Sequence, residues 1–310
     1  MSFLLWAGVT TRASLIRGLD ELSSEPGENF ERYKILSSEV IKHHLDQYQT
    51  KYPNFFHLTS SQEKYGLPTA GGPEDCPFDK EVDGCRNFIF TIQDFLTHPE
   101  GSESSNHLPE VFWSGCLHGN ERVGPTSVVH AAGLLLESAA CEALPRRDAD
   151  KDSWEKQLEK AKTCRADLKE KGISDVHRKW LARLVSTRRI VVVPTANALG
   201  YYQNKREENK IDPNRDFPYD LTDSSLCMRT IAGRTLNEVY QEHMFQLALT
   251  FHAGMEVVGY EWGAPTWLGH LSPDDTAQKN VAAAYSRYGG GWQHSKAYNY
   301  GTMNDMGTFA

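Results

Sequence analysis

The sequence predicts an α/β fold in which helices cover both faces of a mostly parallel sheet, a three-layer α/β/α sandwich. Short apolar segments of strand length alternate along the chain with longer segments of helical spacing, which is typical of this class. Residues 189–195 are almost continuously apolar, as expected for a parallel strand that is buried on both faces. Two apolar runs end in polar turns, near Cys116 and His252. An open α/β sheet places its functional site at such strand ends.

The pattern of apolar residues predicts the elements in order. In residues 37–51, Val40, Ile41, Leu45 and Tyr48 recur at the spacing of one helix face. The other predicted helices are residues 126–138, 235–247 and 274–288. The predicted strands are residues 55–58, 87–95, 110–116, 189–195 and 249–258.

Cap and breaker residues support two of these helices. Pro125 suits the first turn of the helix that follows it, because its missing N–H is no loss there. Ser272 or Asp274 caps the last predicted helix, and the glycines at 289–291 end it.

Length and charge restrict the class of protein. A chain of 310 residues suits one α/β domain. The net charge of −8 and the pI near 5.8 argue against nucleic acid as a general partner. No stretch approaches the roughly 18 apolar residues of a membrane span. The oligomeric state stays open.

Two regions lie outside the predicted core. Residues 1–30 are expected to be a poorly ordered lead or a signal-peptide remnant, with an apolar run at 2–9, and residues 31–310 to form the domain. A charged helical insertion covers about residues 140–180. We expect it to be a solvated surface excursion, with a partner-binding arm as the alternative.

The cysteines do not have zinc-finger spacing. Cys76 and Cys85 flank a loop and would form a local disulfide in an exported protein. Cys116 is expected to be a small core residue rather than a reactive thiol. Localisation stays open, with a secreted or lysosomal/vacuolar protein favoured slightly over a cytoplasmic one.

The most informative segment is residues 113–125, where a strand passes through a polar turn into a helix. His118 and Glu121 lie in that turn, three residues apart, which suits two ligands of a zinc ion. Catalytic zinc usually takes three protein ligands and keeps a position for water. His252 is the best third candidate, because it ends another apolar run. A bare His-x-x-Glu is weak evidence in a chain with 12 histidines, and a surface or structural His is the alternative.

A third segment completes a recognisable set. The order His118-Gly-Asn-Glu121, then Asp212-Pro-Asn-Arg-Asp-Phe-Pro, then His252-Ala-Gly resembles the zinc carboxypeptidases of the carboxypeptidase A superfamily. The resemblance runs from about Tyr33 to the end of the chain. It implies a mixed, mostly parallel sheet between helices, and one Zn²⁺ per chain held by His118, Glu121 and His252.

The resemblance also implies roles for the residues around the metal. Arg206 would stabilise a developing oxyanion, Asn214 and Arg215 would bind a free C-terminal carboxylate, and Asp212 would orient His118. Peptide or protein C-termini would then be the substrates. The alternatives are a solvated loop Arg for Arg206, and turn chemistry around Pro213 for Asp212 and Asn214.

The chain departs from the family pattern after His252. The family's general base is a Glu on a late strand, and the stretch to Ala310 looks too short to contain it. Where a substrate-covering Tyr is expected, the sequence reads Gly-Thr-Phe at 307–309, and Tyr298 and Tyr300 are off register. Glu256 and Glu261 are poor substitutes for the base. We therefore expect a C-terminally incomplete domain with little peptidase activity.

The resulting hypothesis is a metallocarboxypeptidase that releases C-terminal residues through a zinc-activated water. A related zinc amidohydrolase or deacylase is the second reading. A non-catalytic module that binds zinc and peptide C-termini is the third, motivated by the missing base.

Overall fold

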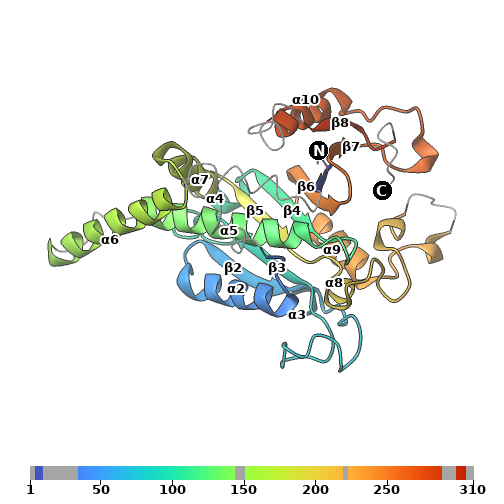
Figure 1. Cartoon of the computed structure of the whole chain (residues 1–310), viewed down its shortest axis with the longest axis horizontal. Helices are drawn as coiled ribbons and strands as arrows, with labels where there is room; N and C mark the ends of the chain where they lie inside the picture. Colours follow the sequence, from blue (N-terminus) through green and yellow to red (C-terminus); the bar gives the residue numbers. More distant parts are fainter. Residues whose placement is uncertain (1–3, 10–33, 144–150, 219–222, 288–297, 305–310) are drawn as a thin grey trace.

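A mixed sheet of eight strands forms the centre of the molecule, in the order β2-β3-β5-β4-β6-β1-β7-β8 (Figure 1). The computed structural model describes residues 4–9, 34–143, 151–218, 223–287 and 298–304. The strands are β1 (Leu4–Val9), β2 (Phe56–Ser60), β3 (Phe88–Ile92), β4 (Glu110–Gly115), β5 (Arg189–Val193), β6 (Phe245–Ala253), β7 (Val257–Tyr260) and β8 (Asn299–Thr302). β5, β4, β6 and β1 run parallel to one another, and β2 and β3 pair antiparallel with their neighbours. β7 is antiparallel to β1 and parallel to β8.

Helices cover both faces of this sheet, so the predicted fold class is confirmed. They are α2 (Ser38–Lys51), α3 (Ser61–Tyr65), α4 (Glu103–Asn106), α5 (Val123–Glu142), α6 (Lys151–Glu170), α7 (Asp175–Thr187), α8 (Ala198–Gln203), α9 (Ile231–Glu242) and α10 (Asp275–Tyr285). In the described residues no helix is long and apolar enough to cross a membrane.

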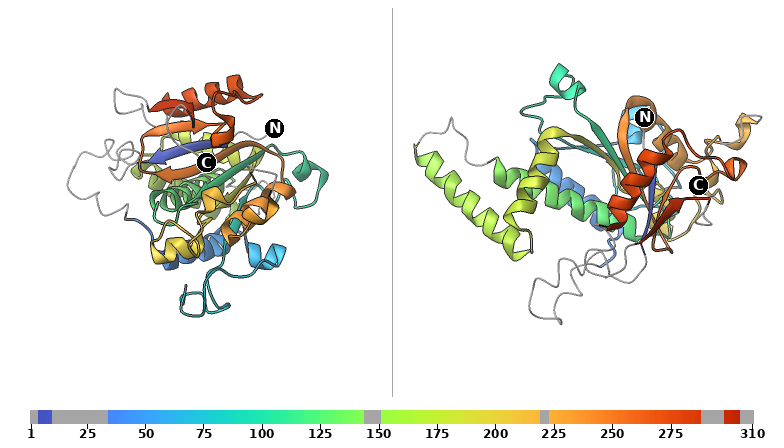
Figure 2. Two further views of the ribbon diagram at one scale, coloured as in Figure 1. Left: turned by 90° about the vertical axis from the view of Figure 1, so that its right-hand side faces the viewer. Right: turned by 90° about the horizontal axis from the view of Figure 1, so that it is seen from above.

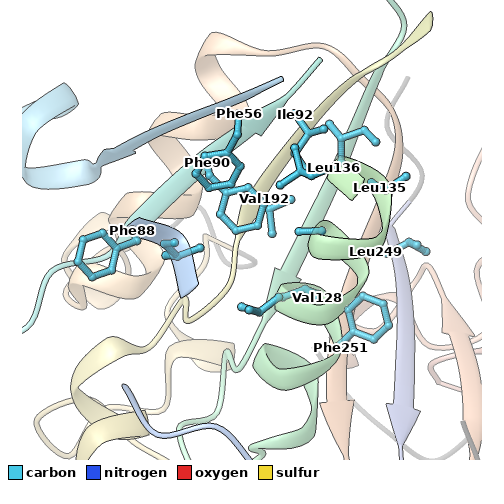
Figure 3. Packing of buried hydrophobic residues seen from close by; sticks show 14 of the residues in the cluster. Phe56, Phe88, Phe90, Ile92, Val128, Leu135, Leu136, Val192, Leu249 and Phe251 are labelled. Carbon is cyan, nitrogen blue, oxygen red and sulfur yellow. The ribbon is translucent and has the colours of Figure 1, made fainter. Parts of the chain in front are cut away.

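The alternation of side chains along β5 shows how the layers form. Ile190 and Val192 join the core cluster under α2 and α5, whereas Val191 and Val193 join the cluster under α9. Figure 3 shows the first cluster, in which side chains of α5 pack against those of β2, β3 and β5. A strand buried on both faces must be continuously apolar, which is why residues 189–195 were recognisable in sequence.

Most predicted elements are present with shifted ends. Ser37 caps α2 by accepting from the Val40 N–H, and α5 contains the predicted helix 126–138 but is longer at both ends. The largest differences are at α9 and β6. The helix predicted at 235–247 begins and ends earlier, and the strand predicted at 249–258 divides into β6 and β7. Gly254 has a φ of +109° and reverses the chain between these strands, a conformation that glycine adopts without steric cost.

The segment Leu4–Val9, which the sequence analysis places in the N-terminal lead, is part of the sheet in this structure. This segment forms β1, which lies inside the sheet between β6 and β7. Its register places Gly8 beside His252 and Val9 beside Ala253. An apolar run of this length is short for a signal peptide but normal for a strand. Residues 10–33 lie outside the described part of the chain, as do the predicted helix stop at 289–291 and the segment 307–309.

The charged insertion forms the helical pair α6 and α7, of which α6 extends furthest from the sheet (Figures 1 and 2). Leu168 and Ile173 are buried against α5, so the pair is anchored rather than fully solvated. Two disulfides are present. Cys76–Cys85 is the loop bridge considered from sequence, and Cys141–Cys164, which sequence reasoning missed, joins α5 to α6. Cys116 is fully buried in the core with a free thiol.

Candidate metal centre

The turn after β4 presents His118 and Glu121 toward each other. The Glu121 N–H donates to the His118 carbonyl at 3.0 Å, which closes the turn between them. Gly119 sits between them, where a Cβ would lie 2.1 Å from the carbonyl carbon of Gly200 and 2.3 Å from the Lys205 oxygen. Only glycine fits this close approach, so the turn depends on its presence.

His252 reaches the same point because β4 and β6 are adjacent and parallel. Gly115 pairs with Phe251, so the two strands end side by side, and His252 is 1% exposed. His118 Nδ1 lies 2.8 Å from Glu121 Oε1 and 3.1 Å from His252 Nδ1. His252 Nδ1 lies 2.7 Å from Glu121 Oε2. The three ligand atoms lie within 4.8 Å of one another, and among the described residues they form the candidate metal group.

The donor set fits zinc. Two imidazole nitrogens and a carboxylate oxygen are ligands that Zn²⁺ accepts in three-ligand catalytic sites. The carboxylate is held ionised, because contacts with His118 and His252 outweigh the effect of burial and lower the pKa of Glu121 to about 2. Burial lowers the pKa of His252 and favours its neutral form, which is the form that binds a metal.

Asp212 lies on the far side of His118. Its Oδ1 is 3.2 Å from His118 Nε2, although the two groups are not aligned as a hydrogen bond. Burial would lower the pKa of His118, but contacts with Asp212 and Glu121 outweigh it and raise that pKa. Asp212 Oδ1 also accepts from the Asn214 N–H at 2.9 Å, which is turn chemistry around Pro213. The Asp212 carboxylate therefore lies beside His118 and also caps the turn around Pro213.

Arg206 lies beside the metal group with part of its guanidinium exposed. Its Nε and Nη2 are each 3.0 Å from Asp212 Oδ2, and its Nη1 is 3.6 Å from Glu121 Oε1. Its backbone carbonyl accepts from the Gly119 N–H at 3.1 Å. The fixed positive charge is thus attached to the same turn that carries two of the candidate ligands.

Asn214 and Arg215 lie on the short helix η2 (Pro213–Arg215), directly after Asp212. Asn214 is buried and Arg215 is exposed, and Arg215 Nη1 donates to the Asn214 carbonyl at 2.7 Å. Five of the seven predicted site residues therefore form one connected cluster, and Asn214 and Arg215 adjoin it through Asp212.

The two carboxylates considered as substitute bases lie at different ends of β7. Glu256 precedes β7 at the end of the sheet where β6 terminates, and its side chain is exposed. Glu261 follows β7 at the opposite end and accepts from Gln278 Nε2 at 3.0 Å. Glu261 is therefore not near the metal group.

Sequence reasoning missed two buried carboxylates of the loop of residues 205–216, which we call the 205–216 loop. Glu208 and Asp216 are 2% and 0% exposed and bind the N-terminus of α9. Glu208 stands among charged and polar residues in the sequence, which indicates a solvated loop. The pairing with α9 exists only in the folded chain.

Comparison with known proteins gives a family-model match over part of the chain and a shared fold. Residues 176–308 match the family model described as zinc carboxypeptidase. A comparison with curated protein sequences returns no match.

Solved structures agree in fold. A crystal structure of carboxypeptidase A from Helicoverpa armigera aligns with a TM-score of 0.53 and 15% identity, over 96% of this chain and 64% of that one. A crystal structure of thrombin activatable fibrinolysis inhibitor aligns with a TM-score of 0.58 and 11% identity, over 95% of this chain and 64% of that one. Bovine thrombin-activatable fibrinolysis inhibitor, in a structure with tick carboxypeptidase inhibitor, aligns with a TM-score of 0.52 and 10% identity, over 89% of this chain and 79% of that one. The chain thus spans 64% of the length of the first two proteins.

Proposed function

We propose that this chain is a zinc-dependent metallocarboxypeptidase that acts on the C-terminal residues of peptides or proteins. Residues 176–308 match the zinc carboxypeptidase family model, which supports the proposal. The observation that carries the proposal is the convergence of His118, Glu121 and His252, with Arg206 held against Glu121. One zinc ion per chain held by these three residues would supply a water of lowered pKa and a Lewis acid for the scissile carbonyl.

The protein's own residues supply binding and charge. Arg206 places a fixed positive charge beside the metal group, where negative charge develops on the carbonyl oxygen during amide hydrolysis. Arg215 presents an exposed planar guanidinium that matches a carboxylate with two parallel hydrogen bonds. The Asn214 backbone carbonyl accepts a hydrogen bond from Arg215 Nη1 and so helps to fix the Arg215 side chain. Selection of a free C-terminus distinguishes an exopeptidase from an endopeptidase.

The first test is metal stoichiometry and carboxylate selection. Purified protein should bind about one zinc per chain, and His118→Ala and His252→Ala should each lose it. Arg215→Ala should weaken binding of a peptide with a free C-terminus by roughly 2 kcal/mol or more, and should change binding of the amidated peptide little. Arg183→Ala, which alters an exposed Arg on α7, is the matched control. Equal losses for free and amidated peptides would show that Arg215 does not bind the carboxylate.

Turnover decides between the proposal and its alternatives. Release of the C-terminal residue from a chromogenic peptide supports the peptidase. Hydrolysis of an N-acyl amino acid without peptide cleavage supports the amidohydrolase or deacylase. Zinc and carboxylate binding without either activity supports a non-catalytic module.

We also propose an oxidising compartment, secreted or lysosomal/vacuolar, because the structure contains two disulfides. Disulfides persist in exported proteins and are rare in the cytosol. Trapping thiols in intact cells before lysis tests this. Modification of Cys76, Cys85, Cys141 and Cys164 as free thiols would contradict it.

A further inference from the structure

The 205–216 loop is attached to α9 by its two buried carboxylates, Glu208 and Asp216. Glu208 Oε1 accepts from the Ile231 N–H at 2.6 Å, and its Oε2 accepts from the Ala232 N–H at 3.0 Å. These are the first two helical N–H groups of α9, which have no partner inside the helix. The positive end of the helix dipole also favours a carboxylate at this position.

Asp216 binds the residues just before the helix. Its Oδ1 accepts from the Arg229 N–H at 3.0 Å, and its Oδ2 accepts from both the N–H and the hydroxyl of Thr230 at 2.7 Å. Its own carbonyl accepts from the Met228 N–H at 2.7 Å. The two carboxylates therefore receive four consecutive backbone N–H groups, from residues 229 to 232.

This arrangement exceeds what the helix needs for capping. Thr230 already caps α9, because its hydroxyl accepts from the Gly233 N–H at 2.9 Å. Burial raises the pKa of Glu208, and the negative charge of Asp216 adds to that effect. Two neighbouring buried carboxylates are costly to ionise, so a cap alone does not account for them.

The residues that the proposed function uses lie beside or between the two carboxylates: Arg206 is two residues before Glu208, and Asn214 and Arg215 directly precede Asp216. Glu208 and Ile211 exchange backbone hydrogen bonds at 2.9 Å in both directions, which closes a tight turn. On its other side, the Arg206 carbonyl accepts from the Gly119 N–H and from Asn197 Nδ2, both at 3.1 Å. Arg206 is thus held between the turn of the candidate ligands and the Glu208 contact with α9.

We propose that Glu208 and Asp216 are positioning residues that set the location of Arg206, Asn214 and Arg215 relative to the metal group. The inference rests on the proposed function, since it assigns the loop to binding of the C-terminal carboxylate. Each carboxylate directly adjoins the groups it positions, because Glu208 is two residues from Arg206 and Asp216 follows Arg215. The three candidate metal ligands lie on other elements, so loss of this contact removes no ligand and the variants should keep about one zinc per chain.

Glu208→Gln is the principal test, because it keeps the shape and one acceptor oxygen but turns an amide NH₂ toward a backbone N–H of α9. Asp216→Asn makes the same change at the second carboxylate. Glu207→Gln, at the exposed neighbouring position, is the matched control. The measurements are zinc stoichiometry, dissociation constants for one peptide with a free or an amidated C-terminus, and amide hydrogen exchange of residues 205–216.

We expect Glu208→Gln and Asp216→Asn to weaken binding of the free peptide by about 10- to 100-fold, the loss typical of a small misplacement of binding groups. Zinc stoichiometry and binding of the amidated peptide should change little, and exchange in residues 205–216 should accelerate. Glu207→Gln should resemble the wild type in all of these measurements.

Two results would overturn the inference. One is unchanged exchange in residues 205–216 in both variants. The other is an equal loss for free and amidated peptides, which indicates general destabilisation rather than positioning. Failure of the proposed function appears separately, as a wild-type protein that does not distinguish the two peptides. Hydrogen exchange still decides whether the carboxylates hold the loop in that case.

Discussion

Replacing Asp212 by Asn should weaken zinc binding without removing any ligand. Asp212 faces His118 Nε2, the ring nitrogen opposite the candidate ligand atom Nδ1. A carboxylate at that position fixes the ring orientation and raises the basicity of the ligand nitrogen. The Asn side chain keeps the shape and one oxygen, so the change tests the negative charge.

The structure places the expected effect at the low end of the known range. Loss of such a partner typically reduces metal affinity by about 10- to 100-fold. Here the Asp212 charge is shared with Arg206, whose Nε and Nη2 both lie 3.0 Å from Oδ2, and 22% of the Asp212 side chain is exposed. The contact with His118 is also not aligned as a hydrogen bond. We therefore expect a loss of about 10-fold, or about 1.4 kcal/mol.

Competition with a chromophoric zinc chelator measures this affinity without any need for catalysis. Asp223→Asn is the matched control, because Asp223 caps the short helix η3 (Ser224–Leu226) just as Asp212 caps η2. Each carboxylate accepts from the N–H two residues on at 2.9 Å. An Asp212→Asn affinity equal to the wild type would refute the role of Asp212 in orienting His118. A loss shared by Asp223→Asn would assign it to capping instead.

Three further predictions concern stability and the metal turn. Contacts with His243 and Arg189 outweigh burial and lower the pKa of Glu110 from 4.5 to about 2. The ionised carboxylate therefore contributes fully to the free energy of unfolding above pH 4.5, and this contribution is lost as the pH falls toward 2. Glu110→Gln should cost about 3 kcal/mol at pH 7 in urea unfolding and less below pH 4.5, whereas a constant difference would contradict this. The Cys141→Ser/Cys164→Ser double variant should lose about 3 kcal/mol, the chain-entropy value for a loop of 23 residues, and an unchanged thermal midpoint would argue against the bridge. Gly119→Ala should lose zinc or fail to fold, because its methyl group would overlap backbone atoms, and normal zinc content would show that the turn can open.

Local sequence determined the layers and the positions of the candidate ligands. The helical spacing of Ile41 and Leu45 and the continuous apolar run of residues 189–195 depend on burial of one face or two, and burial leaves a pattern in the sequence. His118, Glu121 and His252 were recognisable because each follows an apolar run, and parallel strands bring such ends together. The roles of Arg206, Asp212, Asn214 and Arg215 came from a resemblance and await experiment.

Tertiary structure decided the features that depend on distant partners. Leu4–Val9 forms a strand because its backbone pairs with β6 on one side and β7 on the other. No local pattern in the sequence identifies those partners. The division between β6 and β7 at Gly254 depends on a single residue with positive φ inside an apolar run. Glu208 and Asp216 look like solvated loop charges in sequence. Their burial is compensated because the start of α9 and the two residues before it, folded against the loop, donate four backbone N–H groups to these carboxylates.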